Sequence, residues 1–208
     1  MPLNFTKKNL NKEANLLFFQ RLLKNPLQVG ALVPSSRSLA RVVGREVSVL
    51  PDQIVIELGG GTGTLTEELL KCGIPEDQLY VIEIDLLLVN YMKKKFPNVT
   101  ILHGNATDLP RLIPPQFLGK TSSIISGMPF LNMPKLMQKQ IIEGSFECLS
   151  EKGRFIQYTY SPFSSLPAHK FGLSKHRAGI VFKNFPPATI WRYEKTVLKN
   201  PSGLSLTS

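Results

Sequence analysis

Short apolar runs alternate with amphipathic stretches along most of the chain. Five β-branched or apolar runs predict buried strands at residues 53–58, 78–84, 99–104, 122–127 and 153–160. Apolar residues spaced three or four apart predict helices at residues 36–48, 64–72, 86–96 and 134–150. Two last strand-like runs, 178–185 and 188–198, flank a Pro-Pro pair and predict a hairpin. This alternation predicts an α/β fold with a mainly parallel seven-stranded sheet and an antiparallel carboxyl-terminal hairpin.

The first fifty residues carry a different pattern. Residues 9–24 predict an amphipathic helix with two apolar stripes among lysines, one stripe containing Phe18 and the other Phe19 and Leu23. We expect one stripe to pack on the domain and the other to enter a lipid headgroup region; an ordinary packing helix or a subunit contact is the alternative. The sequence therefore divides into residues 1–50, with this helix, a lid and a second helix, and residues 51–208, the α/β domain.

Composition narrows the class of protein. With 208 residues and 42% apolar residues, the chain can bury a full core. It contains no uncharged apolar run near the ~18–20 residues that a membrane-spanning helix needs. The two cysteines, Cys72 and Cys148, match no metal-binding spacing, so we expect no metal.

Positive charge is concentrated at the two ends of the chain. The net charge is +10, and residues 152–208 carry nine Lys or Arg against one acid, while residues 51–120 carry six against nine. Such an excess favours a polyanion as partner, either nucleic acid or an anionic membrane.

A glycine-rich stretch follows the first predicted strand directly. Its pattern is Glu57-x-Gly59-x-Gly61-x-Gly63, which differs from the dinucleotide fingerprint G-x-G-x-x-G. Ligands of open α/β sheets bind at the carboxyl ends of the strands, where glycine allows close approach of the backbone. The second strand ends at Glu83, where an acid accepts hydrogen bonds from ribose hydroxyls. The third is followed by Asn105 and the backbone of Ala106, where an adenine edge would lie.

These motifs resemble those of the class I S-adenosylmethionine-dependent methyltransferases over about residues 53–198. The resemblance implies a Rossmann-like fold, S-adenosylmethionine as cofactor and S-adenosylhomocysteine as product. It places the glycine loop against the methionine and ribose and Glu83 on the ribose. An acid usually stands at the position of Asn105, whose amide oxygen can still accept a hydrogen bond; Asp108 is a substitute. A dehydrogenase is the alternative that the loop spacing disfavours.

The fourth predicted strand ends in "SGMPF", residues 126–130. Methyltransferases acting on adenine carry an Asn/Asp-Pro-Pro-Tyr-like turn here, and Ser126, Pro129 and Phe130 resemble it, with Met128 beside them. Serine fits a flat exocyclic amine less well than asparagine, which favours a softer amine as substrate. We expect Ser126 to contact both cofactor and substrate, and Met128, Pro129 and Phe130 to contact the substrate; packing roles for Pro129 and Phe130 are the alternative.

A more specific resemblance comes from four segments, residues 25–40, 126–134, 157–162 and 184–193. Together they resemble the bacterial phospholipid N-methyltransferases. The resemblance implies methylation of phosphatidylethanolamine towards phosphatidylcholine, or of an ornithine lipid, by a cytoplasmic enzyme peripheral to the inner face of the cytoplasmic membrane. An RNA adenine N6-dimethyltransferase and a non-catalytic membrane-binding module are the alternatives.

Candidate substrate residues follow from the chemistry of amine methylation. Tyr158 and Tyr160 alternate with other residues on the fifth strand, so they share one face. A tyrosine can offer its hydroxyl and ring face to an ammonium, although aromatic strand residues often pack in cores. Lys170 and Arg177 fall in a predicted basic loop that either contacts a lipid phosphate or is simply solvated.

Overall fold

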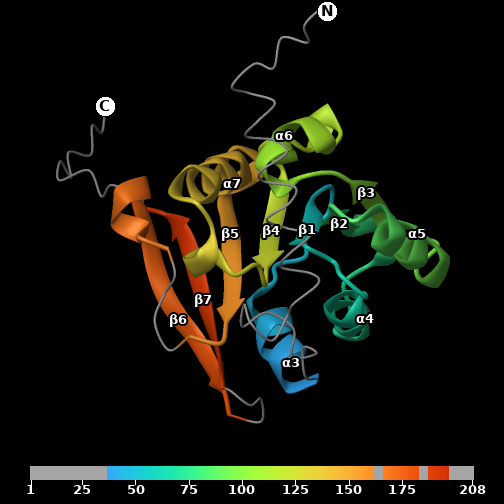
Figure 1. The fold of residues 1–208 in the computed structure, drawn as a ribbon, viewed down its shortest axis with the longest axis horizontal. Helices are drawn as coiled ribbons and strands as arrows, with labels where there is room; N and C mark the ends of the chain where they lie inside the picture. Colours follow the sequence, from blue (N-terminus) through green and yellow to red (C-terminus); the bar gives the residue numbers. More distant parts are fainter. Residues whose placement is uncertain (1–36, 162–165, 183–186, 197–208) are drawn as a thin grey trace, which may run out of the picture.

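The architecture is a single mixed sheet with helices on both faces (Figure 1). It was obtained as a computed structural model that describes residues 37–161, 166–182 and 187–196. The strands are β1 (Ile54–Leu58), β2 (Leu79–Glu83), β3 (Thr100–His103), β4 (Thr121–Ser126), β5 (Leu149–Thr159), β6 (Leu173–Val181) and β7 (Ala188–Lys195). The helices are α3 (Arg37–Glu46), α4 (Thr64–Lys71), α5 (Leu86–Lys95), α6 (Leu109–Leu112) and α7 (Lys135–Cys148).

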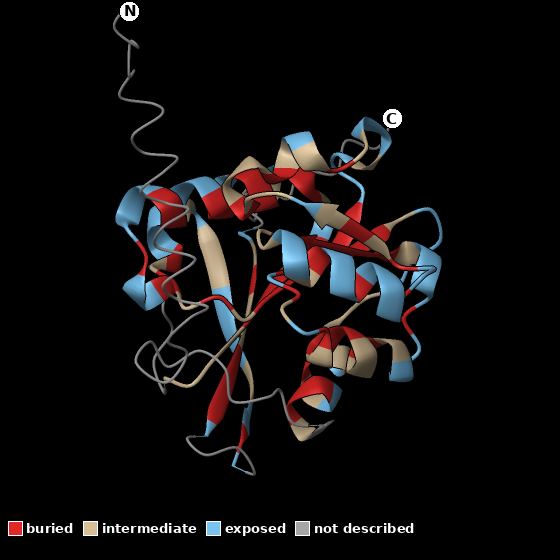
Figure 2. Cartoon of the chain, turned by 45° about the vertical axis from the view of Figure 1, so that its right-hand side comes forward, coloured by how far each residue is buried: buried red, intermediate tan, exposed pale blue. Residues whose placement is uncertain are grey.

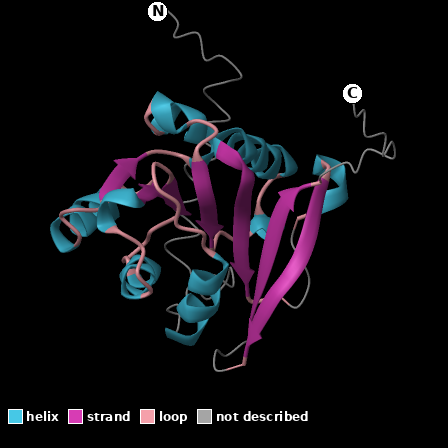
Figure 3. Ribbon diagram, turned by 180° about the vertical axis from the view of Figure 1, so that it is seen from behind, coloured by secondary structure: helices cyan, strands magenta, loops and turns pink. Residues whose placement is uncertain are grey.

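Strand order in the sheet is β3-β2-β1-β4-β5-β7-β6. The first five strands pair in parallel, and β7 runs antiparallel to both β5 and β6. The long β6–β7 hairpin forms one side of the sheet (Figure 3). The predicted fold class is therefore confirmed. The predicted helix at 9–24, with Phe18, Phe19 and Leu23, lies outside the described residues.

Two apolar clusters hold the layers together. On one face, residues of α3, α4 and α5, such as Leu39, Leu69 and Met92, pack on the sheet. On the other, α6 and α7 contribute residues such as Leu109 and Ile141. Figure 2 shows buried residues concentrated in the central strands and on the inward sides of the helices. Strand β1, at the centre, is buried along its whole length, as expected for a parallel strand covered on both faces.

The edge strand β6 begins at Leu173, five residues before the predicted start. Arg177, predicted to lie in a basic loop, therefore lies on this strand. Apolar alternation is missing here because β6 has only β7 as a neighbour, and charged side chains are common on exposed edge strands. Strand β5 likewise begins earlier than predicted, at Leu149.

Candidate active site

The glycine loop lies between β1 and α4, at the carboxyl edge of the sheet. Gly59, Gly61 and Gly63 have φ angles of 79°, 55° and 75°, all in the left-handed region that favours glycine. A Cβ on Gly63 would clash with the ring of Phe96, whereas a Cβ on Gly61 would meet no atom within 4 Å. Gly61 therefore faces open space in front of the sheet, and Gly63 is fixed by packing behind the loop.

Glu83, the last residue of β2, holds this loop in place. Its Oε2 accepts a hydrogen bond from the Gly61 backbone N–H at 2.8 Å. Its Oε1 accepts from the backbone N–H groups of Ile84 and Asp85 at 2.8 and 2.9 Å. Three backbone donors orient a carboxylate that lies beside the open space at Gly61. Because each carboxylate oxygen can accept two hydrogen bonds, Oε2 keeps one position for a ligand hydroxyl.

Glu57 lies beneath the loop and is buried. The hydroxyl of Thr66 on α4 donates to Glu57 Oε2 at 2.6 Å. Burial raises the pKa of Glu57 to about 8; the Thr66 hydrogen bond opposes this shift and the charge of Glu83 adds to it. Glu57 is therefore mostly protonated at neutral pH, and a cation bound above it would favour its ionised form.

The segment after β3 forms the third wall of this edge. Asn105 precedes the 3₁₀ turn η2 (Ala106–Asp108), and its Oδ1 accepts from the Thr107 backbone N–H at 3.1 Å. That oxygen has room for a second donor. Ala106 is buried and belongs to the core cluster on the α7 face. The glycine loop, the Glu83 carboxylate and the Asn105 amide oxygen thus lie at the carboxyl ends of three neighbouring strands. This arrangement suits a nucleoside ligand.

Comparison with known proteins shows which family the chain belongs to. The family profile of ribosomal RNA adenine dimethylase matches residues 18–142, more than half of the chain. The chain belongs to this family. It is an S-adenosylmethionine-dependent methyltransferase. That the glycine loop, Glu83 and Asn105 hold S-adenosylmethionine stays a prediction, which their geometry fits.

The chain is similar both to a lipid methyltransferase and to rRNA methyltransferases. An ornithine lipid N-methyltransferase of Singulisphaera acidiphila is 26% identical over 150 residues, which are 71% of this chain and 78% of that protein. Ribosomal RNA small subunit methyltransferase A of Thermotoga petrophila is 30% identical over 125 residues. The second alignment covers 57% of this chain and 43% of the rRNA enzyme, so the chain spans less than half of that relative.

Solved structures show the same fold at low identity. A TehB-like methyltransferase from Corynebacterium glutamicum has a TM-score of 0.56 and 14% identity, covering 88% of this chain and all of its own. TrmN from Thermus thermophilus has a TM-score of 0.57 and 18% identity, covering 83% of this chain and 53% of its own. The predicted Rossmann-like fold and cofactor are thus confirmed.

The turn after β4 is held by hydrogen bonds to buried side chains. Ser126 has no exposed surface, and its Oγ accepts from the Met128 backbone N–H at 3.2 Å. The buried amide of Gln157 on β5 donates to the Met128 carbonyl at 3.4 Å. Ser126 therefore shapes the turn in this structure, and its direct contact with cofactor or substrate stays a prediction.

Phe130 is buried at the same turn. Its side chain is 1% exposed and packs edge-to-face on Phe155, with ring centroids 6.1 Å apart. The ring therefore has a packing role in this structure, and its contact with a substrate stays a prediction. Pro129 precedes the 3₁₀ turn η4 (Phe130–Asn132) and Met128 is nearly buried.

Tyr158 on β5 and Tyr160, one residue beyond its end, are both partly buried against the α3–α4–α5 cluster, so they do lie on one face. The hydroxyl end of the Tyr158 ring lies against Gly127, because a Cβ on Gly127 would clash with both Cζ and Oη of Tyr158. Tyr158 is thus brought to the turn after β4. The catalytic roles of both tyrosines stay predictions.

The two predicted basic contacts separate in space. Lys170 lies in the 3₁₀ turn η5 (Ala168–Phe171) and lines a pocket against α7, which Arg177 on β6 does not line. Sequence reasoning missed three residues that shape the site: Thr66, Gly127 and Gln157. Their partners come from other elements, and no local motif marks such contacts.

Proposed function

We propose that the protein transfers methyl groups from S-adenosylmethionine to the amine of a membrane lipid, either phosphatidylethanolamine towards phosphatidylcholine or an ornithine lipid. The reaction takes place at the inner face of the cytoplasmic membrane. The nitrogen–carbon bond forms as the sulfonium–carbon bond breaks. The products are S-adenosylhomocysteine, the methylated amine and a proton.

The turn after β4 carries this proposal. A flat adenine amine needs an oxygen acceptor in its plane and an aromatic ring against the base. At the corresponding positions here, the Ser126 hydroxyl is buried and engaged with Met128, and Phe130 is in the core. This turn suits a small flexible amine better than a base. The alignment with the ornithine lipid enzyme covers 78% of that protein, against 43% of the Thermotoga petrophila rRNA enzyme and 62% of a probable rRNA enzyme of Methanococcoides burtonii, which supports the same substrate class.

The position of Tyr158 supports amine methylation as the proposed chemistry. An alkyl ammonium must lose its proton, which water can accept, before nitrogen attacks the methyl group. A partly buried pocket favours the neutral amine, and a tyrosine ring and hydroxyl then accommodate the cationic product. The ring of Tyr158 against Gly127 is placed beside the turn where this exchange would occur.

RNA adenine dimethylation is the second candidate. It is favoured by the family profile and by the rRNA methyltransferase relatives. The net charge of +10 suits RNA as well as an anionic membrane.

A direct competition between substrates tests the proposal. The purified protein is given S-adenosylmethionine with a labelled methyl group, together with vesicles containing phosphatidylethanolamine or ornithine lipid, or with small-subunit ribosomal RNA. We expect label in mono- or dimethylated lipid and none in RNA. The Gly61→Val variant serves as the control without cofactor binding. Label in dimethyladenine with unmodified lipid would replace the proposal by the RNA activity.

A further inference from the structure

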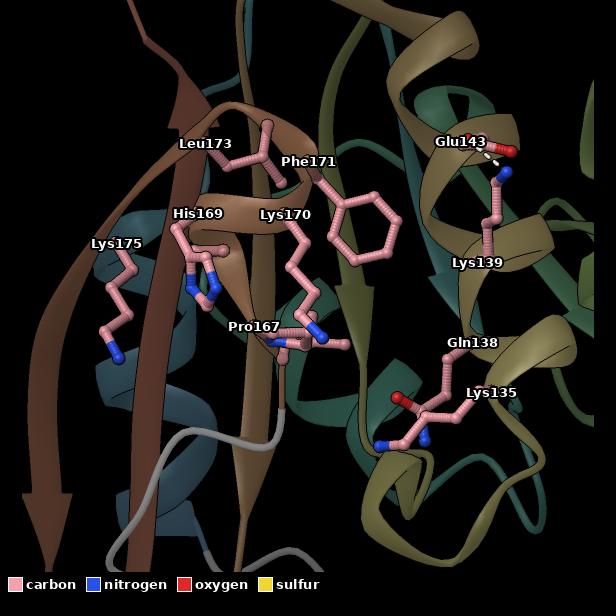
Figure 4. A pocket seen from close by; sticks show the side chains of 12 residues that line it. Lys135, Gln138, Lys139, Glu143, Pro167, His169, Lys170, Phe171, Leu173 and Lys175 are labelled. Carbon is pink, nitrogen blue, oxygen red and sulfur yellow. Dashed lines mark ion pairs between the residues drawn. The ribbon is translucent and has the colours of Figure 1, made fainter.

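A pocket lies away from the glycine loop, between α7, η5 and β6 (Figure 4). Its volume is about 850 Å³, within the range of pockets that hold small ligands. None of the predicted cofactor residues lines it. Lys170, a candidate contact of a lipid phosphate, is among its lining residues.

Basic side chains surround this pocket. Four lysines line it against a single acid, Glu143: Lys135, Lys139, Lys170 and Lys175. Lys139 pairs with Glu143 at 3.7 Å, which leaves the other three lysines unbalanced. Among the described residues, Lys135 and Lys170 have no ion-pair partner. Lys135 on α7 and Lys170 in η5 thus leave positive charge at this space, while Lys175 on β6 lines it with its Nζ over the Trp191 ring, 5.6 Å from the centroid. An anion in the pocket would be attracted by all three charges.

The floor of the pocket is apolar. It is formed by Leu166, Pro167, Ala168, Phe171 and Leu173. These residues, Pro167 apart, belong to or pack against the core cluster on the α7 face. A free inorganic anion would gain nothing from such a floor, whereas a ligand with a charged group on an apolar body would use both parts.

Hydrogen bonds connect the pocket wall to the turn after β4. The buried amide of Gln138 on α7 donates to the Phe130 carbonyl at 2.6 Å and to the Met133 carbonyl at 2.9 Å. Since Gln138 also lines the pocket, a ligand bound there touches a residue that holds the substrate turn.

We propose that this pocket binds the headgroup phosphate of an anionic phospholipid that is not the methyl acceptor. The phosphate meets Lys135 and Lys170, Lys175 adds its charge from β6, and the glycerol and upper acyl carbons lie on the apolar floor. The choice of a lipid rather than another phosphate ester rests on the proposed lipid activity. The bound lipid holds the domain on the membrane while the carboxyl edge of the sheet processes the amine.

The test compares two triple variants with equal loss of charge. The pocket variant is Lys135→Gln, Lys170→Gln and Lys175→Gln; the control is Lys93→Gln, Lys94→Gln and Lys120→Gln, whose lysines are exposed elsewhere. Sedimentation with phosphatidylcholine vesicles, with and without phosphatidylglycerol, measures binding. Lysines near an anionic surface each add to affinity. We expect the pocket variant to bind anionic vesicles about tenfold more weakly than the control, with equal unfolding temperatures and cofactor affinities.

Soluble ligands separate the possible sources of the phosphate. Monomeric short-chain phosphatidylglycerol should bind the parent saturably and the pocket variant weakly, and inorganic phosphate should bind the parent at least tenfold more weakly than this lipid. Equal vesicle binding by the two triple variants would overturn the proposal. Inorganic phosphate binding as tightly as the lipid, or displacement of the lipid by single-stranded RNA at lower concentration, would overturn it as well.

These experiments show whether the pocket proposal or the proposed function fails, because each can fail without the other. If the parent methylates lipid amines but the two triple variants bind vesicles equally, the pocket proposal fails alone. If the pocket variant loses anionic lipid while the parent methylates only RNA, the pocket binds lipid and the proposed function fails.

Discussion

The proposed cofactor side of the carboxyl edge, at the glycine loop, and the proposed substrate side, at the turn after β4, are built by different means. The cofactor side depends on backbone conformation: three glycines with positive φ and a carboxylate that accepts three backbone N–H groups. The substrate side depends on side chains from distant elements, with Gln138 and Gln157 holding one turn and Tyr158 lying against Gly127. Cofactor binding should therefore be broken by backbone changes, and substrate handling by changes in packing.

The largest effect is expected at Gly61. A valine there would strain a φ of 55° and project its side chain into space that no protein atom occupies within 4 Å. We expect Gly61→Val to weaken S-adenosylmethionine binding at least a thousandfold, about 4 kcal/mol, by calorimetry. Gly119→Val is the matched control, because Gly119 has a φ of 68° and equal free space before β4. Unchanged affinity in Gly61→Val, or equal loss in both variants, would contradict the assignment of the loop.

Glu57 tests the electrostatics beneath the loop. Its folded pKa of about 8 lies above the ordinary 4.5, because burial disfavours the charge. The folded protein therefore binds this proton more tightly than the unfolded chain. Its contribution to stability is fully present below pH 4.5 and is lost as pH rises towards 8.

The Glu57→Gln variant should flatten this dependence. Between about pH 5 and pH 7.5, the Glu57 proton accounts for a loss of about 3 kcal/mol in the free energy of unfolding. Glutamine keeps an oxygen acceptor for Thr66 and has no proton to lose. Urea unfolding of parent and variant at the two pH values measures the difference. The same slope in both would show that Glu57 is already ionised in the folded protein.

The Gly127→Ala variant tests whether packing at the turn after β4 affects turnover. A methyl group at this position would overlap the Tyr158 ring and force it to move. We expect Gly127→Ala to lower turnover about tenfold, about 1.4 kcal/mol, while cofactor affinity changes less than threefold. Tyr158→Phe keeps the ring and removes the hydroxyl, so it separates the position of the ring from hydrogen bonding. Full turnover in both variants would remove Tyr158 from the mechanism.

The same contrast explains what the sequence could predict. The strand and helix order follows from apolar periodicity, and the glycine loop with Glu83 is a local motif with a fixed spacing. The start of β6 was missed because its charged residues lie on an exposed edge. The burial of Phe130 could not be predicted because it depends on Phe155, which lies 25 residues further along the chain and on another strand. Contacts that no local pattern encodes could not be predicted, and they gather on the substrate side.

The smallest effect is expected at Asn105, the residue that departs from the usual acid of the family. In the structure its Oδ1 already accepts from the Thr107 backbone N–H, so the oxygen faces donors. An aspartate has oxygens in the same places. Asn105→Asp should therefore change S-adenosylmethionine affinity by no more than about threefold, less than 1 kcal/mol. Asn105→Ala, which removes the oxygen and the hydrogen bond to Thr107, should weaken binding more. If the aspartate variant instead bound as poorly as the alanine variant, the amide nitrogen of Asn105 would be the contacting group, and the adenine would have to present an acceptor there instead of its amine.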